Sequence, residues 1–518
     1  MNRKGIIAAG HPQTCRAAAT ILDEGGNAFD AALAGLCAAC VVEPVLASLG
    51  GGGFLVARPE DGRRRVVVYD FFTQTPRLKR SERDVDFRAV MADFGPTRQE
   101  FHVGLGAMAT PGIVRGLFAA HRDLGRMPMR NLVQPAVSLA REGAALNAAQ
   151  AKIIEVVGAI LKASPVTEEL FRSRQADRGF LREGERLAMP DLADVLETLA
   201  IEGEDLFYRG EIGQRLAQDC TTLGGHITID DLACYRVIQR HPLKISVFGA
   251  QAFLNPPPSF GGLLIAFALQ LYHSLAPERH SGRTVEDVLR LINVMHAACR
   301  VRADISVDGD DRSHEHILRA QLIGRYRDEI AARPLVTRGT THISVIDREG
   351  SAASLTVSNG EGSAYVIPGT GIIMNNMLGE ADINPGGFHR WPPDMRMASM
   401  MAPSLVIDPD DGLIALGSGG SNRIRSAILQ VILNVLGFRM SPDAAVAAPR
   451  AHVEDKCVSL EAGFSKDVVE QVQRSWPNLD AWDHKSMFFG GVHVARRSWA
   501  GQVDGAGDTR RGGAVEIV

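Results

Sequence analysis

The chain has 518 residues, 45% of them hydrophobic and 22% charged, which is the composition of a soluble globular protein with one large domain or two to three ordinary ones. Its 56 basic and 60 acidic side chains leave a net charge of −4, and this imbalance is too small to indicate a nucleic-acid or membrane partner. We expect no signal peptide and no membrane span, because no run of about 18 apolar residues is visible.

The first helical region covers residues 11–44. Its pattern predicts two helices joined at Gly25-Gly26-Asn27, where a glycine helix end and a new helix start are expected. Cys37 and Cys40 stand inside the apolar run of the second helix, so we expect small core residues rather than a metal or redox site. Seven cysteines, an odd number spread along the chain, favour reduced thiols and a cytoplasmic protein.

The rest of the chain alternates between strand-rich and helix-rich regions. Residues 50–72 predict two strands around the turn "PEDG", and residues 110–200 are mostly helical. Residues 245–262 return to strand and loop, and residues 263–333 are helical again. From residue 340 onward the chain is rich in strands, followed by two helices. Strands at both ends with helices between them favour layered packing over independent domains.

The run "GTTHISVID", residues 339–347, alternates apolar and polar side chains as a half-buried strand does. Threonine is ordinary in strands, so β-propensity is one explanation for Thr340. A second explanation is nucleophilic chemistry. If the bond after Gly339 is cut, Thr340 gains an α-amino group with a pKa of about 7.7–8.0. One residue then supplies both the nucleophile and its general base.

Two glycine-rich runs are further candidates for chemistry. "GSGGS", residues 417–421, leads from a predicted strand into a helix that starts near Asn422, and backbone N–H groups in such a turn can stabilise an oxyanion. It lacks the Gly-Lys-Ser/Thr ending of a phosphate-binding loop, and a plain strand-to-helix turn remains an alternative. The four glycines at 50–53 lead into a strand, which favours close backbone packing over phosphate binding.

A set of motifs in order along nearly the whole chain resembles the γ-glutamyltranspeptidases (glutathione hydrolases), which are N-terminal nucleophile hydrolases. They include "EGGNAFDAALA", "LGGGGF", "ATPGIVRG", "NPPPSFGG", "TTHISVID", "MAPSLV", "GSGGSNRI" and "GAGDTRRGGA". The resemblance implies an α+β fold, the four-layer αββα sandwich. It also implies a precursor that cuts itself into a large segment, residues 1–339, and a small segment, residues 340–518, which together form one domain. No cofactor and no metal is implied.

The resemblance assigns roles residue by residue. Thr340 matches the nucleophile, so the cut is expected between Gly339 and Thr340. Ser358 stands where the family has a Thr that hydrogen-bonds the nucleophile. Gly420 and Ser421 stand where the family has a Gly-Gly pair whose amides form the oxyanion hole, and a main-chain donor tolerates the change to Ser.

The substrate-binding positions depart from the family pattern. Phe72 replaces an Arg that pairs with the donor's α-carboxylate, and this change is not conservative. The resemblance assigns further positions to the donor, and they differ from the family as well. Gly360 stands where the family has an Asn, Met377 where it has a Gln, Glu380 where it has an Asp, and Ser399 with Met400 where it has a Ser-Ser pair. Glu380 could still take an ammonium, and Arg77 or Arg396 could replace the missing Arg, although we expect both arginines to be surface charges.

The resemblance therefore implies a self-processing amidohydrolase or acyltransferase, a γ-glutamyltransferase or glutathione hydrolase in type. It would pass the acyl group of a γ-glutamyl or similar small amide to water or an amine. The alternatives are an amidohydrolase for an oxamate-like or glutaryl-like amide, an unprocessed scaffold relative without activity, and a nucleotide-binding enzyme that uses the glycine loops. The expected partners are the small-molecule amide, an amine acceptor and the two segments of the precursor, with a dimer of such units left open.

Overall fold

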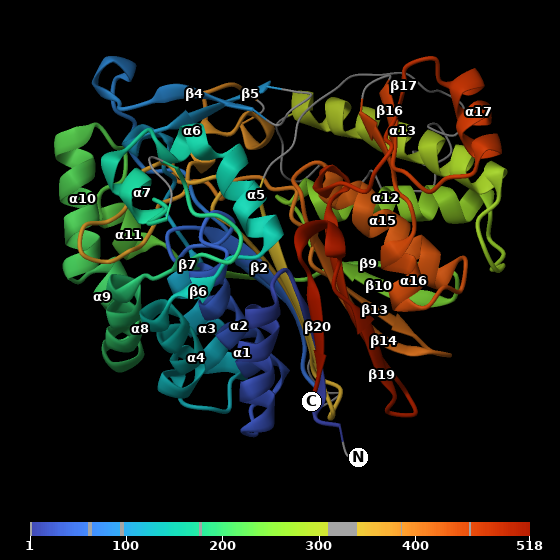
Figure 1. Cartoon of the computed structure of the whole chain (residues 1–518), viewed down its shortest axis with the longest axis horizontal. Coiled ribbons are helices and arrows are strands. Elements are labelled where there is room, and N and C mark those ends of the chain that lie inside the picture. Colours follow the sequence, from blue (N-terminus) through green and yellow to red (C-terminus); the bar gives the residue numbers. More distant parts are fainter. Residues whose placement is uncertain are drawn as a thin grey trace.

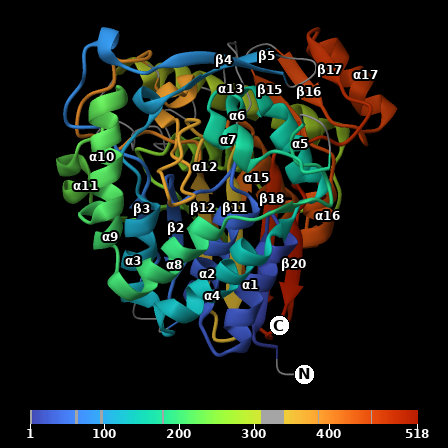
Figure 2. The same ribbon diagram turned by 60° about the vertical axis from the view of Figure 1, so that its left-hand side comes forward.

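The computed structural model describes residues 3–60, 65–93, 98–175, 179–308, 339–384, 386–454 and 457–518. Two antiparallel sheets lie face to face at its centre, and helices cover the outer face of each sheet (Figures 1 and 2). This arrangement confirms the expected α+β, four-layer αββα sandwich. The two ends of the described chain lie side by side at one edge, where the Lys4 N–H donates to the Val518 carbonyl.

The first sheet has seven strands, each antiparallel to its neighbours. Their order is β20 (Ala514–Ile517), β1 (Gly5–Ala9), β11 (Thr341–Asp347), β12 (Ala352–Ser358), β2 (Gly52–Arg58), β3 (Val67–Phe71) and β8 (Ile238–Arg240). The second sheet has six strands, also all antiparallel. Their order is β19 (Val503–Ala506), β18 (Gly491–Ser498), β14 (Gly412–Gly419), β13 (Ser404–Asp408), β10 (Ala250–Leu254) and β9 (Leu243–Val247).

Helices from the first half of the chain cover the first sheet, on the left of Figure 1. Those packed against it are α1 (Pro12–Asp23), α2 (Ala28–Val42) and α3 (Ile113–Leu124), while α4 (Met129–Glu142) packs on α2 and α8 (Pro190–Glu202) packs on α4. Around them lie α5 (Ala148–Val156), α6 (Gly158–Leu161), α7 (Pro165–Leu170), α9 (Asp205–Tyr208), α10 (Glu211–Leu223) and α11 (Ile229–Cys234).

The second sheet is covered on the other side of the molecule by later helices (Figure 1). They are α12 (Phe260–Leu275), α15 (Arg423–Leu436) and α16 (Pro442–Ala447), while α13 (Val285–Asp308) packs on α12 and α17 (Lys466–Ser475) packs on α13. Three small sheets lie outside the sandwich. They are β15 (Ala451–Glu454) with β16 (Cys457–Leu460) and β17 (Leu479–Ala481), β4 (Arg88–Asp93) with β5 (Arg98–Val103), and β6 (Ala144–Ala145) with β7 (Arg186–Leu187).

The two central strands β11 and β12 are buried along their whole length. The expectation that the run at residues 339–347 is a half-buried strand is therefore wrong, because the polar face of β11 packs against the second sheet and not against solvent. His342 satisfies both ring nitrogens there, with Thr356 Oγ1 at 2.7 Å and Ser344 Oγ at 2.8 Å. Ser354 Oγ donates to the Leu416 carbonyl of β14 at 2.9 Å. These bonds allow polar side chains to lie between the sheets, since a buried polar group is costly only when it has no partner.

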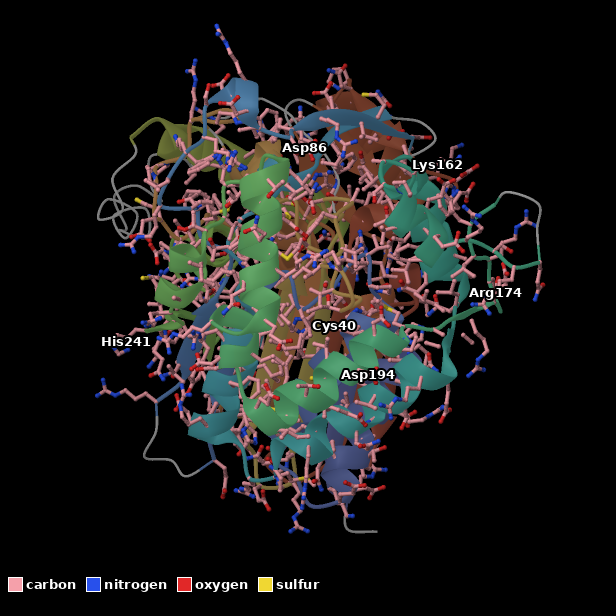
Figure 3. The ribbon with its side chains drawn as sticks, turned by 90° about the vertical axis from the view of Figure 1, so that its left-hand side faces the viewer. Cys40, Asp86, Lys162, Arg174, Asp194 and His241 are labelled. Atoms are coloured by element: carbon pink, nitrogen blue, oxygen red, sulfur yellow. The ribbon has the colours of Figure 1, made fainter. Side chains whose placement is uncertain are left out.

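The two helices expected after residue 11 are α1 and α2, joined as predicted at Gly25-Gly26-Asn27. Asn27 caps α2, because its Oδ1 accepts the N–H groups of Phe29 and Asp30, while Asp30 Oδ2 accepts the Asn27 N–H. Every residue of α2 is buried; Cys40 falls near the middle of the view in Figure 3, whereas Lys162 and Arg174 fall toward its edge. The seven cysteines all lie within the described residues, and no disulfide joins any two of them.

Several elements were not predicted, among them the first strand β1 and the C-terminal strands β18, β19 and β20. The helical expectation for residues 263–333 is confirmed by α12 and α13 as far as Asp308, and its remainder lies outside the described residues. Within the described ranges, no helix is long and apolar enough to cross a membrane.

Candidate active site

Thr340 stands one residue before β11, the third strand of the first sheet, and its side chain is buried. Its neighbours Thr341 and His342 are fixed by pairing with Val357 and Thr356 of β12. The Thr340 hydroxyl donates to the carbonyl oxygen of Gly339 at 2.7 Å. The predicted nucleophile thus lies at the start of a rigid strand, directly beside the carbonyl of the bond expected to be cut.

Ser358, the last residue of β12, reaches the same carbonyl. Its Oγ donates to Gly339 O at 2.8 Å and accepts the N–H of Gly360 at 3.0 Å. In the uncut chain the hydroxyls of Ser358 and Thr340 therefore both donate a hydrogen bond to the Gly339 carbonyl oxygen. Two donors on one carbonyl withdraw electron density from its carbon and favour attack there.

Gly339 itself is held from its other side. Its N–H donates to Oε1 of Glu361 at 2.9 Å, and the Glu361 side chain is buried. A hydrogen bond from an N–H to a carboxylate is among the stronger ones in proteins. Glu361, which the sequence analysis did not single out, thus fixes the residue that precedes the nucleophile.

The predicted glycine turn joins β14 to α15 beside the nucleophile. A Cβ at Gly419 would collide with the Thr340 carbonyl oxygen, so only glycine allows this approach. Gly420 and Ser421 both have positive φ, 120° and 50°. Their carbonyls accept the N–H groups of Arg423 and Ile424 at the start of α15. Ser421 keeps the left-handed backbone that glycine adopts more easily, and its Oγ donates to Asp382 Oδ2 at 3.2 Å.

A small pocket opens in front of Thr340. It is lined by Gly339, Thr340, Ser358 and Ser421, by the expected donor positions Phe72, Met377, Glu380, Ser399 and Met400, and by Asp382, Ile383, Met401 and Ile424. The structure thus brings together most residues that the resemblance assigned to the donor. Its volume is about 30 Å³ in the uncut chain, enough for about two water molecules and too small for a donor.

Two of the assigned residues do not line this pocket, Gly360 and Gly420. Gly360 has φ of 63°, and a Cβ there would collide with Asn376 Oδ1 and Glu380 Oε1. The space that an Asn side chain at 360 would need is therefore taken by the Asn376 amide, which accepts the Glu361 N–H at 3.1 Å, and by the Glu380 carboxylate.

Neither arginine considered as a replacement for the missing guanidinium lines the pocket. Arg77 is half-exposed and pairs with Asp394 at 3.4 Å, as expected of a surface charge. For Arg396 that expectation is wrong, because its side chain is only 5% exposed. It lies behind Phe72, where it donates to the Phe72 carbonyl and the Tyr235 hydroxyl, with Asp70 Oδ1 at 3.5 Å from its Nε.

Two arginines, Arg302 and Arg423, lie behind the turn at Ser421. Arg302 donates to Asn422 Oδ1 at 2.9 Å and to the Asp382 carbonyl at 3.3 Å. Arg423 lies 3.4 Å from Glu454 and stacks on a phenylalanine ring. Burial lowers the pKa of both arginines. Neither arginine lines the pocket.

A buried carboxylate lies on the helix side of β11. Glu43 accepts the Thr341 hydroxyl at 3.0 Å and the Thr14 hydroxyl at 3.4 Å. Burial raises the pKa of Glu43 to about 7, although the hydroxyl bonds and the charge of Arg511 oppose this rise. Arg511 packs beneath Gly419 and Gly420, and burial lowers its pKa to about 10. The side chains that support the nucleophile and the turn are therefore both ionisable and buried.

This arrangement fits nucleophilic attack on a carbonyl by the Thr340 hydroxyl. Sequence reasoning missed Glu361 and Asp382. Each is a single acid outside the strands and long helices, Asp382 in the 3-10 helix Ala381–Ile383, and its place depends on tertiary packing. Among the described residues, no group of three His, Cys, Asp or Glu side chains is placed to hold a metal ion.

The chain is similar in sequence to a known protein family and to individual relatives. The sequence profile described as Gamma-glutamyltranspeptidase matches residues 14–518. A glutathione hydrolase proenzyme of Escherichia coli (strain K12) is 28% identical over 503 residues, which cover 91% of this chain and 85% of the relative. The Acylase ACY 1 proenzyme of Pseudomonas sp. (strain SE83) is 31% identical over 490 residues, which cover 90% of this chain and 86% of the relative.

Solved structures share the fold. A cephalosporin acylase from Bacillus halodurans superimposes with a TM-score of 0.84 at 24% identity, over 99% of this chain and 96% of that one. A γ-glutamyltranspeptidase chain from Helicobacter pylori superimposes with a TM-score of 0.52 at 26% identity, over 62% of this chain and 90% of that one. The relatives thus carry two kinds of name, hydrolases of glutathione and acylases.

Proposed function

Because this chain belongs to the gamma-glutamyltranspeptidase family of self-processing hydrolases, we propose that Thr340 is its nucleophile and that it cuts itself between Gly339 and Thr340. The observation that carries this proposal is the Gly339 carbonyl, which accepts hydrogen bonds from the hydroxyls of both Thr340 and Ser358. Residues 1–339 and 340–518 would then be the two subunits of one sandwich.

Self-cleavage would proceed through an ester. Thr340 Oγ attacks the carbonyl carbon of Gly339, the C–N bond breaks, and the proton passes to the departing nitrogen, so that Gly339 becomes esterified to the threonine side chain. Water then hydrolyses the ester, giving a Gly339 carboxylate and a free Thr340 amine. Since Gly339 lines the pocket, its departure would also make room for a donor.

The free amine would be the base of the mature enzyme. It takes the Thr340 hydroxyl proton as Oγ attacks the donor amide, and it returns the proton to the leaving amine. The amides of Gly420 and Ser421 would hold the oxyanion. Water or an acceptor amine then releases the acyl group. Glutathione hydrolases and acylases are both among the relatives, and the proposed substrate is accordingly a small amide. The seven cysteines, none of them in a disulfide in the described chain, support a reducing compartment, such as the cytoplasm.

The test is the processing of the purified protein. The wild-type chain should give two fragments on a denaturing gel, and mass spectrometry should place the new N-terminus at Thr340. Thr340→Ala should remain one folded chain without turnover. A wild-type chain that is never cut would favour the alternative of an unprocessed scaffold protein. Cleavage of Thr340→Ala at the same bond would refute the assigned nucleophile.

A further inference from the structure

The N–H groups of Gly420 and Ser421, proposed for the oxyanion hole, depend on the directions of their peptide planes. The Gly420 carbonyl accepts the Arg423 N–H at 3.0 Å, so the Ser421 N–H, on the opposite side of the same trans peptide, points away from α15. Among the described residues, no carbonyl accepts the N–H of Gly420 or of Ser421. The two N–H groups thus remain as donors for a bound ligand.

This direction requires a backbone conformation that serine disfavours. Ser421 has a φ of 50°, in the left-handed region that glycine adopts freely and other residues do not. Its carbonyl accepts the Ile424 N–H at 3.0 Å, which fixes its helix side. If φ relaxed to a negative value while that bond remained, the peptide plane between Gly420 and Ser421 would rotate, and the Ser421 N–H would turn with it. Gly420 would not resist this rotation, because glycine tolerates a wide range of φ.

The Ser421 side chain opposes this relaxation. Its Oγ donates to Asp382 Oδ2 at 3.2 Å, and a hydrogen bond to a carboxylate is among the stronger ones in proteins. Asp382 is itself held, because its main-chain carbonyl accepts a hydrogen bond from the Arg302 guanidinium at 3.3 Å. The same guanidinium donates to Asn422 Oδ1 at 2.9 Å. The turn and the short helix at residues 381–383 are therefore joined by two separate links.

We propose that Asp382 is a positioning residue for the oxyanion hole. Its carboxylate holds the Ser421 hydroxyl, which keeps the left-handed backbone in place and the Ser421 N–H directed at the carbonyl oxygen of the donor. This inference rests on the proposed function, in which Thr340 attacks that carbonyl. It also accounts for the serine at 421, where the family has a glycine, because a hydroxyl bonded to an acid replaces the conformational freedom of the glycine.

The test is the acylation of the self-cleaved enzyme by p-nitrophenyl acetate, whose acyl group is too small to need a fitted pocket. Thr340 Oγ forms an ester with the acetyl group, the hydroxyl proton passes to the α-amine, and the p-nitrophenolate that leaves is measured by absorbance in a single turnover. The uncut Thr340→Ala chain provides the blank.

Asp382→Ala should lower the acylation rate constant at least tenfold, as part of the roughly 100-fold that the loss of one oxyanion donor costs. Asp382→Asn keeps an oxygen that accepts the Ser421 hydroxyl, so it should recover most of that loss. Asp410→Ala is the control, because it removes an exposed acid next to the end of β14 that lies far from Gly419, and it should react as the wild type does. A rate constant for Asp382→Ala within about threefold of the wild type would overturn the proposal.

A double-mutant cycle shows whether Asp382 acts through residue 421. Glycine adopts a φ of 50° without a side-chain bond, so in the Ser421→Gly background Asp382→Ala should change the rate constant less than about threefold. Ser421→Ala loses the hydroxyl and keeps the strain. It should be as slow as Asp382→Ala, and the double variant should be no slower than either one. An equal loss on Asp382→Ala in the serine and glycine backgrounds would show that Asp382 acts by another route and would refute the assigned role.

Self-cleavage separates positioning from a general disturbance of the site. In the uncut chain the Gly339 carbonyl accepts the hydroxyls of Thr340 and Ser358, so Asp382→Ala should cut itself as fast as the wild type on denaturing gels. Self-cleavage that slows as much as acylation would overturn the proposal. A wild-type chain that does not cut itself, or is cut and not acylated at Thr340, would overturn the proposed function and this inference together. A cut and acylated wild type with an equally fast Asp382→Ala variant would overturn this inference alone.

Discussion

Ser358 donates its hydroxyl to the carbonyl oxygen of Gly339 at 2.8 Å, at the bond expected to be cut. If this donor stabilises the charge that develops on the oxygen, Ser358→Ala should slow self-cleavage by about 100-fold, the usual effect of losing one oxyanion donor. Ser358→Thr keeps the hydroxyl and should still cleave itself. The measurement is the fraction of uncut chain over time on denaturing gels.

A serine four residues earlier on the same strand provides the control. Ser354 Oγ donates to a carbonyl of the second sheet, so Ser354→Ala also loses a buried hydrogen bond, but away from the scissile carbonyl. It should be less stable by about 1–3 kcal/mol and still cleave itself. If Ser358→Ala matures as fast as the wild type, the serine has no role in cleavage.

Much of the fold followed from local patterns in the sequence. The helix pair around Asn27 and the strand–turn–helix at residues 412–436 were predicted because capping residues and glycines act within a few positions. By contrast, β1 has only five residues, and it becomes a strand through pairing with β11 and β20, hundreds of residues away. The burial of both faces of β11 was missed because only the second sheet covers its polar face.

The candidate site was predictable to a similar extent. Thr340 and Ser358 lie at strand ends, and their places follow from the hairpin between β11 and β12 together with the family motif. Arg396 was judged a surface charge because its burial depends on Asp70 and Tyr235, which lie far away in the sequence. Asp382 was missed for the same reason, since only the tertiary structure brings it to Ser421.

Gly419 allows the turn to lie against the nucleophile. Gly419→Ala would place a methyl group on the Thr340 carbonyl oxygen, and relief of the overlap by shifting Thr340 should cost about 2 kcal/mol. If all of that cost falls on the cleavage step, self-cleavage slows about 30-fold. Gly386→Ala is the matched control, because its Cβ would only touch Arg390 at 3.9 Å. Equal maturation rates for the two variants would show that the turn need not contact Thr340.

Ser421 combines a positive φ of 50° with a hydrogen bond from its side chain. Ser421→Ala and Ser421→Gly both remove the hydroxyl, and they differ mainly in how easily they adopt this backbone. The glycine variant should therefore be the more stable of the two by about 1 kcal/mol, measured by urea unfolding. An alanine variant as stable as the glycine variant would mean that the turn relaxes to another conformation at no cost.

Glu43 should make stability depend on pH near neutrality. Its pKa is about 7 in the folded protein, raised mainly by burial, against 4.5 for an ordinary glutamate, so the folded state holds the proton more tightly than the unfolded state. The resulting stability is fully present below pH 4.5 and is lost as pH rises through 7. The loss amounts to about 3 kcal/mol, because each pKa unit corresponds to about 1.4 kcal/mol.

Glu43→Gln keeps an acceptor for the Thr341 hydroxyl and removes this titration. Between pH 5 and 8 the variant should lose less unfolding free energy than the parent, by about 2.5 kcal/mol, because part of the titration lies below pH 5. Both proteins are measured by urea unfolding in the Thr340→Ala background, so that each is one uncut chain. Buried histidines such as His342, whose pKa burial lowers, contribute equally to both proteins and cancel in the difference. The exposed Glu24→Gln should behave as the parent, and a Glu43→Gln curve parallel to the parent's would show that Glu43 does not take up a proton on folding.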